Sequence, residues 1–350
     1  MESRNVGSFV MPMGQQTQAN KNKRTISSYV VQFRELGLLF FILLLAVLIQ
    51  MRNPSFLTWE NINDLITNTA ILSILAVGMM LVIITRGIDL SIGATLALSG
   101  MISAMVVSHF PQVHPLLVLL LGTGIGLVCG GGLGYLVAKI GILPIIATLG
   151  MMNVFRGLTY LISDGKWVSA HQMTTSFKFL GTGTLFRINH LIWIALFIYL
   201  IAYYFMGHTR TGRQIYAVGS NPEAARISGI RPERTLWLVY VIMGGLSGMA
   251  GVLWVSKFAS AQGDTASGYE LSVIAACVVG GVSIAGGVGK LSGVLLGAIL
   301  LGIINNALPL INVSAFWQMG IQGSIILAAV LLNAIVKRGV DRNHLMRRKV

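Results

Sequence analysis

The sequence predicts an all-α polytopic membrane protein with about ten transmembrane helices. Of its 350 residues, 55% are hydrophobic and only 10% are charged, whereas charged residues make up about 25% of a typical soluble domain. Long runs without any charge recur along the chain, and a membrane span needs roughly 20 mainly apolar residues. This composition excludes a soluble globular protein.

The ten predicted spans follow from these apolar runs. The longest run, 90–138, must hold two spans, and we divide it at 109–115, where two prolines and two histidines interrupt the apolar residues. Two spans are less regular, because 36–51 is short and 140–162 contains Arg156. Taken in order, the runs are 36–51, 65–85, 90–138, 140–162, 188–207, 235–256, 271–289, 291–308 and 315–336.

Lysine and arginine residues predict the orientation of the spans, because cytoplasmic loops collect them. Ten spans place both termini on one side, and if that side is the cytoplasm, 19 basic residues face inward and 5 face outward. We therefore predict a polar cytoplasmic arm at 1–34, a transmembrane domain at 35–336 and a basic cytoplasmic tail at 337–350. The net charge of +14 is spread over membrane-flanking loops, which indicates contact with membrane lipid and no nucleic-acid partner.

The loop at 207–235 is the largest predicted cytoplasmic loop, and its polar, basic residues predict one short exposed helix. Asn221 is a good N-cap, Pro222 suits the first helical position, and Glu223 favours the positive end of the helix dipole. Gly229 can close the C-terminus. From these residues alone, an ordinary loop helix between two spans is the alternative interpretation.

No motif in the chain predicts catalysis, so we expect a protein that is not an enzyme. A glycine-rich segment before Lys290 resembles a phosphate-binding loop, but Ile284 replaces its first glycine and Leu291 replaces the metal-binding Ser or Thr. Cys129 and Cys277 have no histidine or acidic neighbours at ligand spacing, so we expect no metal site. Any energy from ATP must therefore come from another polypeptide.

Polar residues within or beside the predicted spans are candidates for a translocation pathway. Arg156 lies well inside a span, where a charge usually faces a cavity or a partner; snorkelling to the outer surface is its alternative role. Asp89 lies at a predicted break between helices, beside Arg86, with which an ion pair is possible. Asn305 and Asn306 are adjacent amides suited to sugar hydroxyl groups, and interhelical hydrogen bonding is their alternative role.

Four motifs, which follow one another along the chain, together cover most of its length. They are TRGIDLSIGA at 85–94, ATLG followed by RG at 147–157, GRQIYAVGSNPEAARISGI at 212–230 and VVGGVSIAGGVGKLSGVLLGAIL at 278–300. In this order and at this length they are highly specific. They resemble the monosaccharide permeases of ATP-binding-cassette importers, the ribose-type family.

The resemblance implies a bacterial inner-membrane permease, built from two such subunits, that moves a small carbohydrate by alternating access. It implies two ATPase subunits below, which would hold ATP and magnesium, and a periplasmic sugar-binding protein above. This chain would then hold no cofactor of its own. The pathway would be shaped around Asp89, Asn153, Phe155 and Arg156. The ATPase-coupling residues would lie in the 207–235 loop, namely Asn221, Pro222, Glu223, Ala224, Ala225, Arg226 and Gly229.

Two other functions remain as alternatives. A related permease for another small solute, such as a branched-chain amino acid or a nucleoside, would share the architecture. A self-sufficient secondary sugar transporter is a different class, and a proton symporter usually needs titratable groups in its spans, which are nearly absent here. A channel would have no use for a coupling helix. The sequence leaves open which sugar is moved and whether the second permease subunit is identical or a paralogue.

Overall fold

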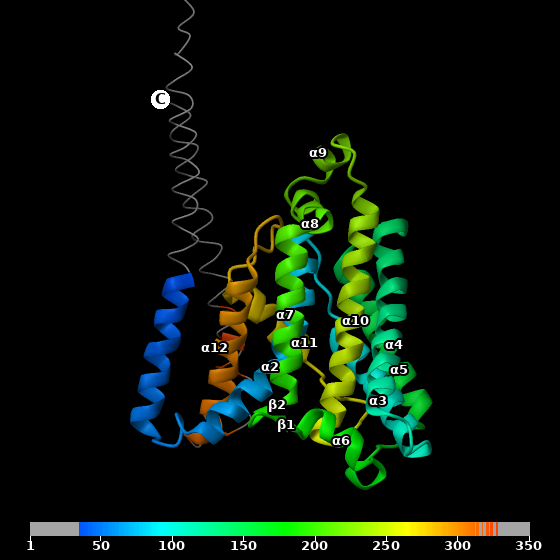
Figure 1. The fold of residues 1–350 in the computed structure, drawn as a ribbon. Coiled ribbons are helices and arrows are strands. Elements are labelled where there is room, and N and C mark those ends of the chain that lie inside the picture. Colours follow the sequence, from blue (N-terminus) through cyan, green and yellow to red (C-terminus); the bar gives the residue numbers. More distant parts are fainter. Residues whose placement is uncertain are drawn as a thin grey trace, which may run out of the picture.

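The computed structural model describes residues 35–311 together with residues 313, 314, 317, 320, 321, 323, 324 and 327. Helices make up most of this part of the chain, which confirms the prediction of an all-α membrane protein. Eight of the helices described are long and apolar enough to cross a membrane, and they run roughly parallel to one another (Figure 1). They are the helix Glu35–Arg52, α2 (Trp59–Ile84), α3 (Ile92–His109), α4 (Pro115–Tyr135) with the π-helical turn η1 (Leu136–Ile140), α5 (Pro144–Ser163), α7 (His190–His208), α10 (Pro232–Phe258) and α12 (Leu291–Leu310).

One of the ten predicted spans is wrong. The run 271–289 contains only α11 (Tyr269–Val279), an 11-residue helix that is too short to cross a membrane. The chain then turns at Gly280 and Gly281 and has no helix before α12, since each glycine in a helix interior costs up to about 1 kcal/mol relative to alanine. The predicted span at 315–336 falls largely outside the described residues, and the predicted arm at 1–34 and tail at 337–350 lie outside them too.

Local sequence signals set several of the helix ends. The hydroxyl of Thr58 accepts a hydrogen bond from the N–H of Asn61 (3.4 Å), so that α2 begins at Trp59, before the predicted apolar run. At the start of α4, the ring of His114 accepts from a backbone N–H and Pro115 is the first helical residue. The cap of α2 adds a polar first turn that hydropathy alone does not include, whereas the first turn of α4 is apolar.

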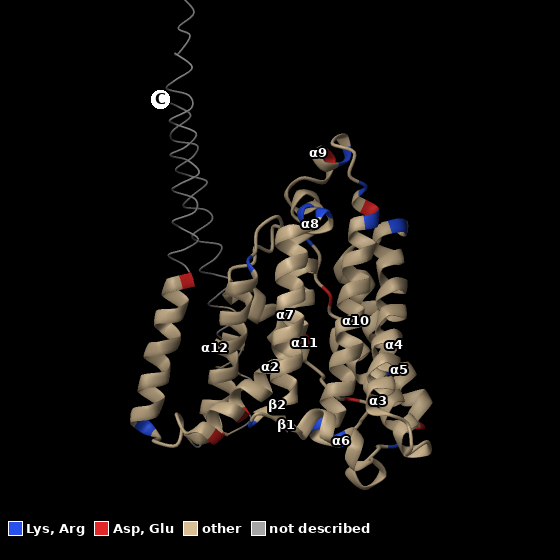
Figure 2. Cartoon of the chain, in the orientation of Figure 1, with Lys and Arg blue, Asp and Glu red and all other residues tan. Residues whose placement is uncertain are grey.

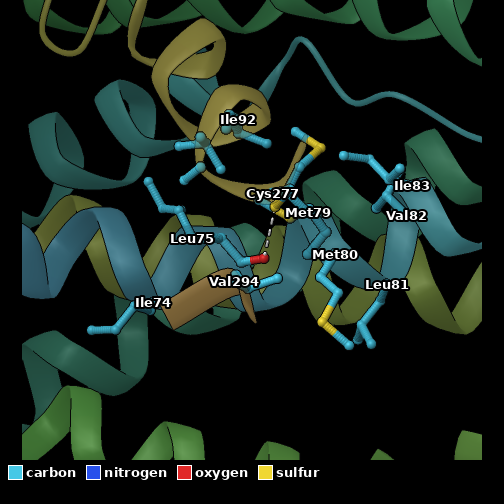
Figure 3. Packing of buried hydrophobic residues seen from close by; sticks show 14 of the residues in the cluster. Ile74, Leu75, Met79, Met80, Leu81, Val82, Ile83, Ile92, Cys277 and Val294 are labelled. Carbon is cyan, nitrogen blue, oxygen red and sulfur yellow. Dashed lines mark hydrogen bonds between the residues drawn. The ribbon is translucent and has the colours of Figure 1, made fainter. Parts of the chain in front are cut away.

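The core of the bundle is centred on α2, most of which is buried. Leu75 and Met79 of α2 belong to the same hydrophobic cluster as Cys277 of α11 and Val294 of α12 (Figure 3). The thiol of Cys277 donates a hydrogen bond of 3.3 Å to the carbonyl oxygen of Ala76. The short helix α11 is thereby fixed against α2 although it does not cross the bundle.

Glycine residues bring the backbones of α4 and α10 into contact. A Cβ atom on Gly126 would collide with the carbonyl oxygen of Gly244, and one on Gly130 would collide with that of Tyr240. Gly122, one turn before Gly126, lies at the same contact, because a Cβ atom on Gly248 would collide with the carbonyl oxygen of Gly122. Small residues spaced by four allow membrane helices to approach this closely. The glycine row of α4 therefore packs within one chain.

Short elements between α5 and α7 cover the end of the bundle that lies away from the 207–235 loop (Figure 1). Phe177 is fully buried there, and its carbonyl oxygen accepts a hydrogen bond of 2.6 Å from the hydroxyl of Ser256 in α10. The elements are η2 (Ala170–Gln172), α6 (Thr175–Thr182) and the antiparallel pair β1 (Thr184–Leu185) and β2 (Ile188–Asn189).

The loop at 207–235 folds as two helices, not the one predicted. α8 (Arg210–Ser220) and α9 (Pro222–Ile227) project from the end of α7, and the chain then enters α10 (Figure 1). The missed helix α8 is amphipathic, because its buried residues recur every three or four positions: Gly212, Ile215, Val218 and Gly219. Lys and Arg residues gather around α8, α9 and the adjoining end of α10 (Figure 2).

Candidate functional site

The N-terminus of α9 is built from the three cap residues that the sequence indicated. Oδ1 of Asn221 accepts a hydrogen bond from the backbone N–H of Ala224 (3.1 Å), which makes Asn221 the N-cap. Pro222 is the first helical residue, and Glu223 lies in the first turn. A negative charge at this position is favoured by the helix dipole.

The C-terminus of α9 is closed by a Schellman motif around Gly229. This residue has a φ of 79°, a backbone conformation that glycine adopts without strain. Its N–H donates to the carbonyl oxygen of Arg226 (3.0 Å), and the N–H of Ile230 donates to that of Ala225 (3.0 Å). These two hydrogen bonds satisfy carbonyl groups that the helix end would leave free.

One side of α9 is exposed. Glu223, Ala224 and Arg226 are exposed, whereas Ala225 is buried against the bundle. Sequence reasoning did not select Ile227, which is 89% exposed. The sequence did contain a signal for Ile227, because it is an aliphatic residue within an otherwise polar predicted helix. Together these side chains give the tip a small apolar surface between an acidic and a basic residue.

Two contacts fix α9 relative to its neighbours. Asn221 ends α8 as well as beginning α9, because its N–H donates to the carbonyl oxygen of Ala217 (3.0 Å). On the other side, the guanidinium of Arg226 forms an ion pair with Glu233 in the first turn of α10. No flexible linker therefore separates α9 from α8.

The structure corrects the ion pair considered between Arg86 and Asp89, because each side chain has other partners. Nε and Nη2 of Arg86 donate to the carbonyl oxygens of Gly219 (2.7 Å) and Ser220 (2.5 Å) at the end of α8. Asp89 is buried, and its Oδ1 accepts from the N–H and the hydroxyl of Ser91 (2.8 and 2.7 Å). Asp89 thus organises the start of α3, while Arg86 binds α8.

Non-helical backbone enters the bundle at this break, as expected of the motif TRGIDLSIG. The segment 85–91 descends from below α8 between the helices (Figure 1), which membrane proteins tolerate only where such backbone is buried in protein or lines a cavity. The hydroxyl of Thr148 in α5 donates to the carbonyl oxygen of Ile88 (3.3 Å). The fully buried hydroxyl of Tyr240 lies against Gly87 and has no hydrogen-bond partner within the described residues. Sequence reasoning missed Tyr240 because it stands in an apolar run.

Asn153 and Phe155 of α5 point in different directions. Asn153 is exposed, and its amide donates to the carbonyl oxygen of Leu149 in its own helix (3.0 Å). Phe155 is buried and packs in one cluster with Ala94 and Leu98 of α3. Of Asn153 and Phe155, which were both predicted to shape the pathway, only Asn153 is therefore accessible on the surface of the chain.

Arg156 binds the loop that precedes α11. Its Nη1 donates to the carbonyl oxygens of Gly263 and Thr265, both at 2.8 Å. The side chain is half-buried, so it is neither isolated in the apolar bundle nor extended into solvent. Arg156 thus holds α5 against the irregular loop before α11, whereas Arg86 lies in irregular backbone and binds the end of the helix α8.

The two asparagines of α12 differ in their surroundings. Asn306 exchanges two hydrogen bonds with Asn61 of α2 (3.1 and 3.0 Å), whereas Asn305 is exposed. Both lie near the C-terminal end of α12, which ends at Leu310, and not at its middle. The amide of Asn306 thus forms the interhelical contact that was its alternative role.

No metal-binding cluster is evident in the part of the chain that the structure describes. No group of three or more histidine, cysteine, aspartate or glutamate side chains there could hold a metal ion. The polar groups brought together lie instead at α8, α9 and the break before α3. The polar groups of α9 form an exposed surface, and those of α8 and of the break before α3 form hydrogen bonds at helix ends.

Comparison with known proteins identifies the family. The family model described as Branched-chain amino acid transport system / permease component matches residues 61–330. The ribose import permease protein RbsC of Escherichia coli (strain K12) is 39% identical over 297 residues, which cover 84% of this chain and 92% of the relative. RbsC of Bacillus subtilis (strain 168) is 40% identical over 301 residues, covering 86% and 92%. The galactose/methyl galactoside import permease protein MglC of Escherichia coli (strain K12) is 33% identical over 332 residues, covering 90% and 97%.

No solved structure matches the chain. The family match nevertheless spans the described bundle from the first turn of α2 to beyond α12, including α8, α9 and the break before α3. The chain therefore belongs to the branched-chain amino acid transport system / permease component family.

Proposed function

We propose that this chain is the membrane-spanning subunit of an ATP-binding-cassette importer for a small, ribose-like monosaccharide in a bacterial inner membrane. Relatives matched over more than nine-tenths of their length are named as import permeases for ribose or for galactose and methyl galactoside. The chain has no complete phosphate-binding loop of its own. ATP and magnesium therefore bind a separate ATPase subunit.

The observation that carries the proposal is the shape of α9. This helix lies at the tip of the described bundle, is capped at both ends and contacts α8 and α10 (Figure 1). Its exposed residues Glu223, Ala224 and Ile227 offer one charge and an apolar surface to a groove on a partner. A rigid helix that protrudes from a membrane bundle is suited to receive force from an ATPase.

A second permease subunit fits the free side of α5. Gly150, Asn153 and Gly157 recur along this helix, and a Cβ atom on either glycine would meet no atom of the chain within 4 Å. Asn153 is exposed among apolar side chains, and polar residues in a membrane face a cavity or a partner, not lipid. We place the sugar pathway along this side of α5, between two permease subunits.

The mechanism is alternating access in which the delivery protein selects the sugar. A periplasmic binding protein releases the sugar into the space between the subunits, and ATP binding below moves α9. Because α9 continues into α8 without a linker, its displacement reaches the bundle. The exposed amide of Asn153 on this side of α5 is suited to hydrogen-bond a sugar hydroxyl group.

The experiment is uptake of radiolabelled ribose into proteoliposomes. Three preparations are compared: the chain alone with an imposed proton or sodium gradient, the chain with its ATPase and internal ATP, and both with the loaded binding protein. We expect concentrative uptake only in the third. Accumulation driven by an ion gradient in the first would contradict the proposal and support a secondary transporter.

A permease for a branched-chain amino acid is the second candidate, since the family model is described by that substrate. The same third preparation distinguishes the two. Accumulation of leucine or isoleucine, without accumulation of ribose or galactose, would favour the second candidate while leaving the importer mechanism intact. Labelled adenosine tests a nucleoside substrate in the same assay.

A further inference from the structure

Three segments that are far apart in the sequence meet directly below α8. They are the end of α2 with the break that follows it, the end of α8, and the glycine-rich turn between α11 and α12. We call this meeting point the cytoplasmic junction and define it by Ile84, Arg86, Gly219, Ser220, Gly286 and Gly287.

Arg86 is the polar centre of the cytoplasmic junction. The last carbonyl groups of a helix have no partner within it, and Arg86 supplies donors to two of them, on Gly219 and Ser220. A positive charge at this end is also favoured by the helix dipole of α8. Arg86 is itself exposed, and its backbone has a φ of 66°, a conformation uncommon for any residue with a side chain.

The glycine-rich turn completes the junction from the other side. The N–H of Gly287 donates to the carbonyl oxygen of Ile84, the last residue of α2 (2.9 Å). A Cβ atom on Gly287 would lie 2.9 Å from Cα of Ser220, and one on Gly286 would collide with Cγ of Arg86. Both glycines have positive φ, 84° and 74° for Gly286 and Gly287, so the turn fits only without side chains.

A further hydrogen bond ties α8 to the same turn. The hydroxyl of Tyr216 donates to the carbonyl oxygen of Gly289 (2.8 Å). Burial raises the pKa of Tyr216, so the phenol keeps its proton at neutral pH and remains a donor. The end of α8 is thus bound to both interruptions of the bundle, the break before α3 and the turn before α12.

We propose that Arg86 is a positioning residue that transmits the displacement of α9 to the two interrupted helix pairs, α2–α3 and α11–α12. The inference rests on the proposed function, because it requires an ATPase that moves α9. A tilt of α9 about Asn221 displaces the carbonyl groups of Gly219 and Ser220, and Arg86 carries that displacement into the segment 85–91. From there the route leads to Asp89 and, through the carbonyl of Ile88, to Thr148 of α5.

The test compares variants in the complete importer, with ATPase and binding protein, in proteoliposomes. Arg86→Met keeps a long side chain but loses both hydrogen bonds to α8. Arg86→Lys keeps the positive charge but lacks the planar guanidinium group that donates to two carbonyl oxygens at once. The matched control is Arg213→Met, because Arg213 is an exposed arginine of α8 whose only described side-chain hydrogen bond is local, to the carbonyl oxygen of His208 (3.4 Å). Three quantities are measured for each: importer purified, basal ATP hydrolysis, and hydrolysis and uptake stimulated by the loaded binding protein.

We expect Arg86→Met to lower stimulated hydrolysis and uptake about tenfold, as for loss of a hydrogen bond from a charged group. The amount of importer and its basal hydrolysis should stay within about twofold of the unaltered protein, because no ATPase contact is removed. Stimulated hydrolysis and uptake of Arg86→Lys should lie between those of Arg86→Met and those of the unaltered importer. Arg213→Met should match the unaltered importer in both quantities.

Unchanged stimulation in Arg86→Met would overturn the inference. So would a parallel loss of assembled importer and basal hydrolysis, since that result assigns Arg86 a purely structural role. Gly287→Ala places a Cβ atom against Ser220 and so disturbs the junction at the glycine-rich turn; it must also lower the stimulated activities selectively. Failure of both Arg86→Met and Gly287→Ala to assemble would assign the junction a structural role. If the unaltered importer shows no ATP-driven uptake, the proposed function fails, and this inference fails with it.

Discussion

The backbone at Gly229 decides how α9 ends, and so how it is presented to a partner. An alanine at φ 79° would be strained by about 1 kcal/mol or more. Gly229→Ala should therefore unwind the last turn of α9 part of the time and weaken ATPase binding about fivefold. The measurement is titration of the purified ATPase against the chain in nanodiscs.

Gly207→Ala is the matched control for this prediction. Gly207 lies in the last turn of α7, near the same end of the bundle, and a Cβ atom there would meet nothing within 4 Å. Its variant should bind the ATPase as the unaltered chain does. Equal affinity for all three proteins would show that the end of α9 makes no contribution to binding.

Residues whose partners are close in sequence were predictable, and residues with distant partners were not. Asn221, Pro222 and Gly229 fulfil the capping roles that their order along the chain indicated, because a cap bonds within three or four residues. Arg86 binds carbonyl groups 133 and 134 positions away. In the sequence, the nearest opposite charge, on Asp89, was the obvious partner, and only the folded chain offers the end of α8 instead.

At the scale of elements, the contact between α4 and α10 depends on the absence of side chains at a few positions. Gly126→Ala places a Cβ atom against the carbonyl oxygen of Gly244, and such overpacking costs about 1–3 kcal/mol. We expect the midpoint of thermal unfolding in detergent to fall by several degrees. Gly124→Ala, two residues away on a free side of α4, should leave that midpoint unchanged or raise it.

This pair of variants also tests where the glycine row of α4 lies in the assembly. Gly124 lies on the side of α4 that contacts no other described part of the chain, and Gly126 lies on the side that contacts α10. If Gly124→Ala destabilises the protein and Gly126→Ala does not, α4 uses the side of Gly124 to contact a partner. That result would contradict packing within one chain. Both proteins should be compared at the same detergent concentration.

Hydropathy located most of the spans, because a long apolar run is a sufficient signal for a helix that crosses a membrane. It could not recognise α11, since the run 271–289 is as apolar as the others and the backbone leaves the helix at Gly280. It also missed α8, which lies outside the apolar runs and buries only one face. The place where a membrane helix is interrupted, and the formation of a surface helix such as α8, depend on contacts between distant segments. The local hydropathy of the sequence does not show these contacts.

For the whole molecule, the distribution of lysine and arginine predicts that α9 faces the cytoplasm and that α6 faces outward. The test uses single cysteines at two exposed positions, Ser228→Cys and Thr175→Cys, in a chain in which Cys129 and Cys277 are replaced by alanine. An impermeant thiol reagent added to intact cells should label position 175 and spare position 228. Permeabilised cells provide the control, because both positions should then react.

Labelling of position 228 but not of position 175 in intact cells would reverse the orientation and place α9 out of reach of any cytoplasmic ATPase. Labelling of both positions in intact cells would instead indicate leaky membranes, which a cytoplasmic thiol protein in the same cells detects. The result therefore bears on the proposed function as well as on the fold.

Because Asn221 both ends α8 and begins α9, the direction of α9 depends on where α8 ends. One residue added to a helix turns everything beyond it by about 100° and advances it by about 1.5 Å. One residue added within α8 would therefore rotate α9, with Glu223 and Ile227, toward a different side of the molecule. Exchanging side chains on α9 would instead change its exposed surface and leave its direction unchanged.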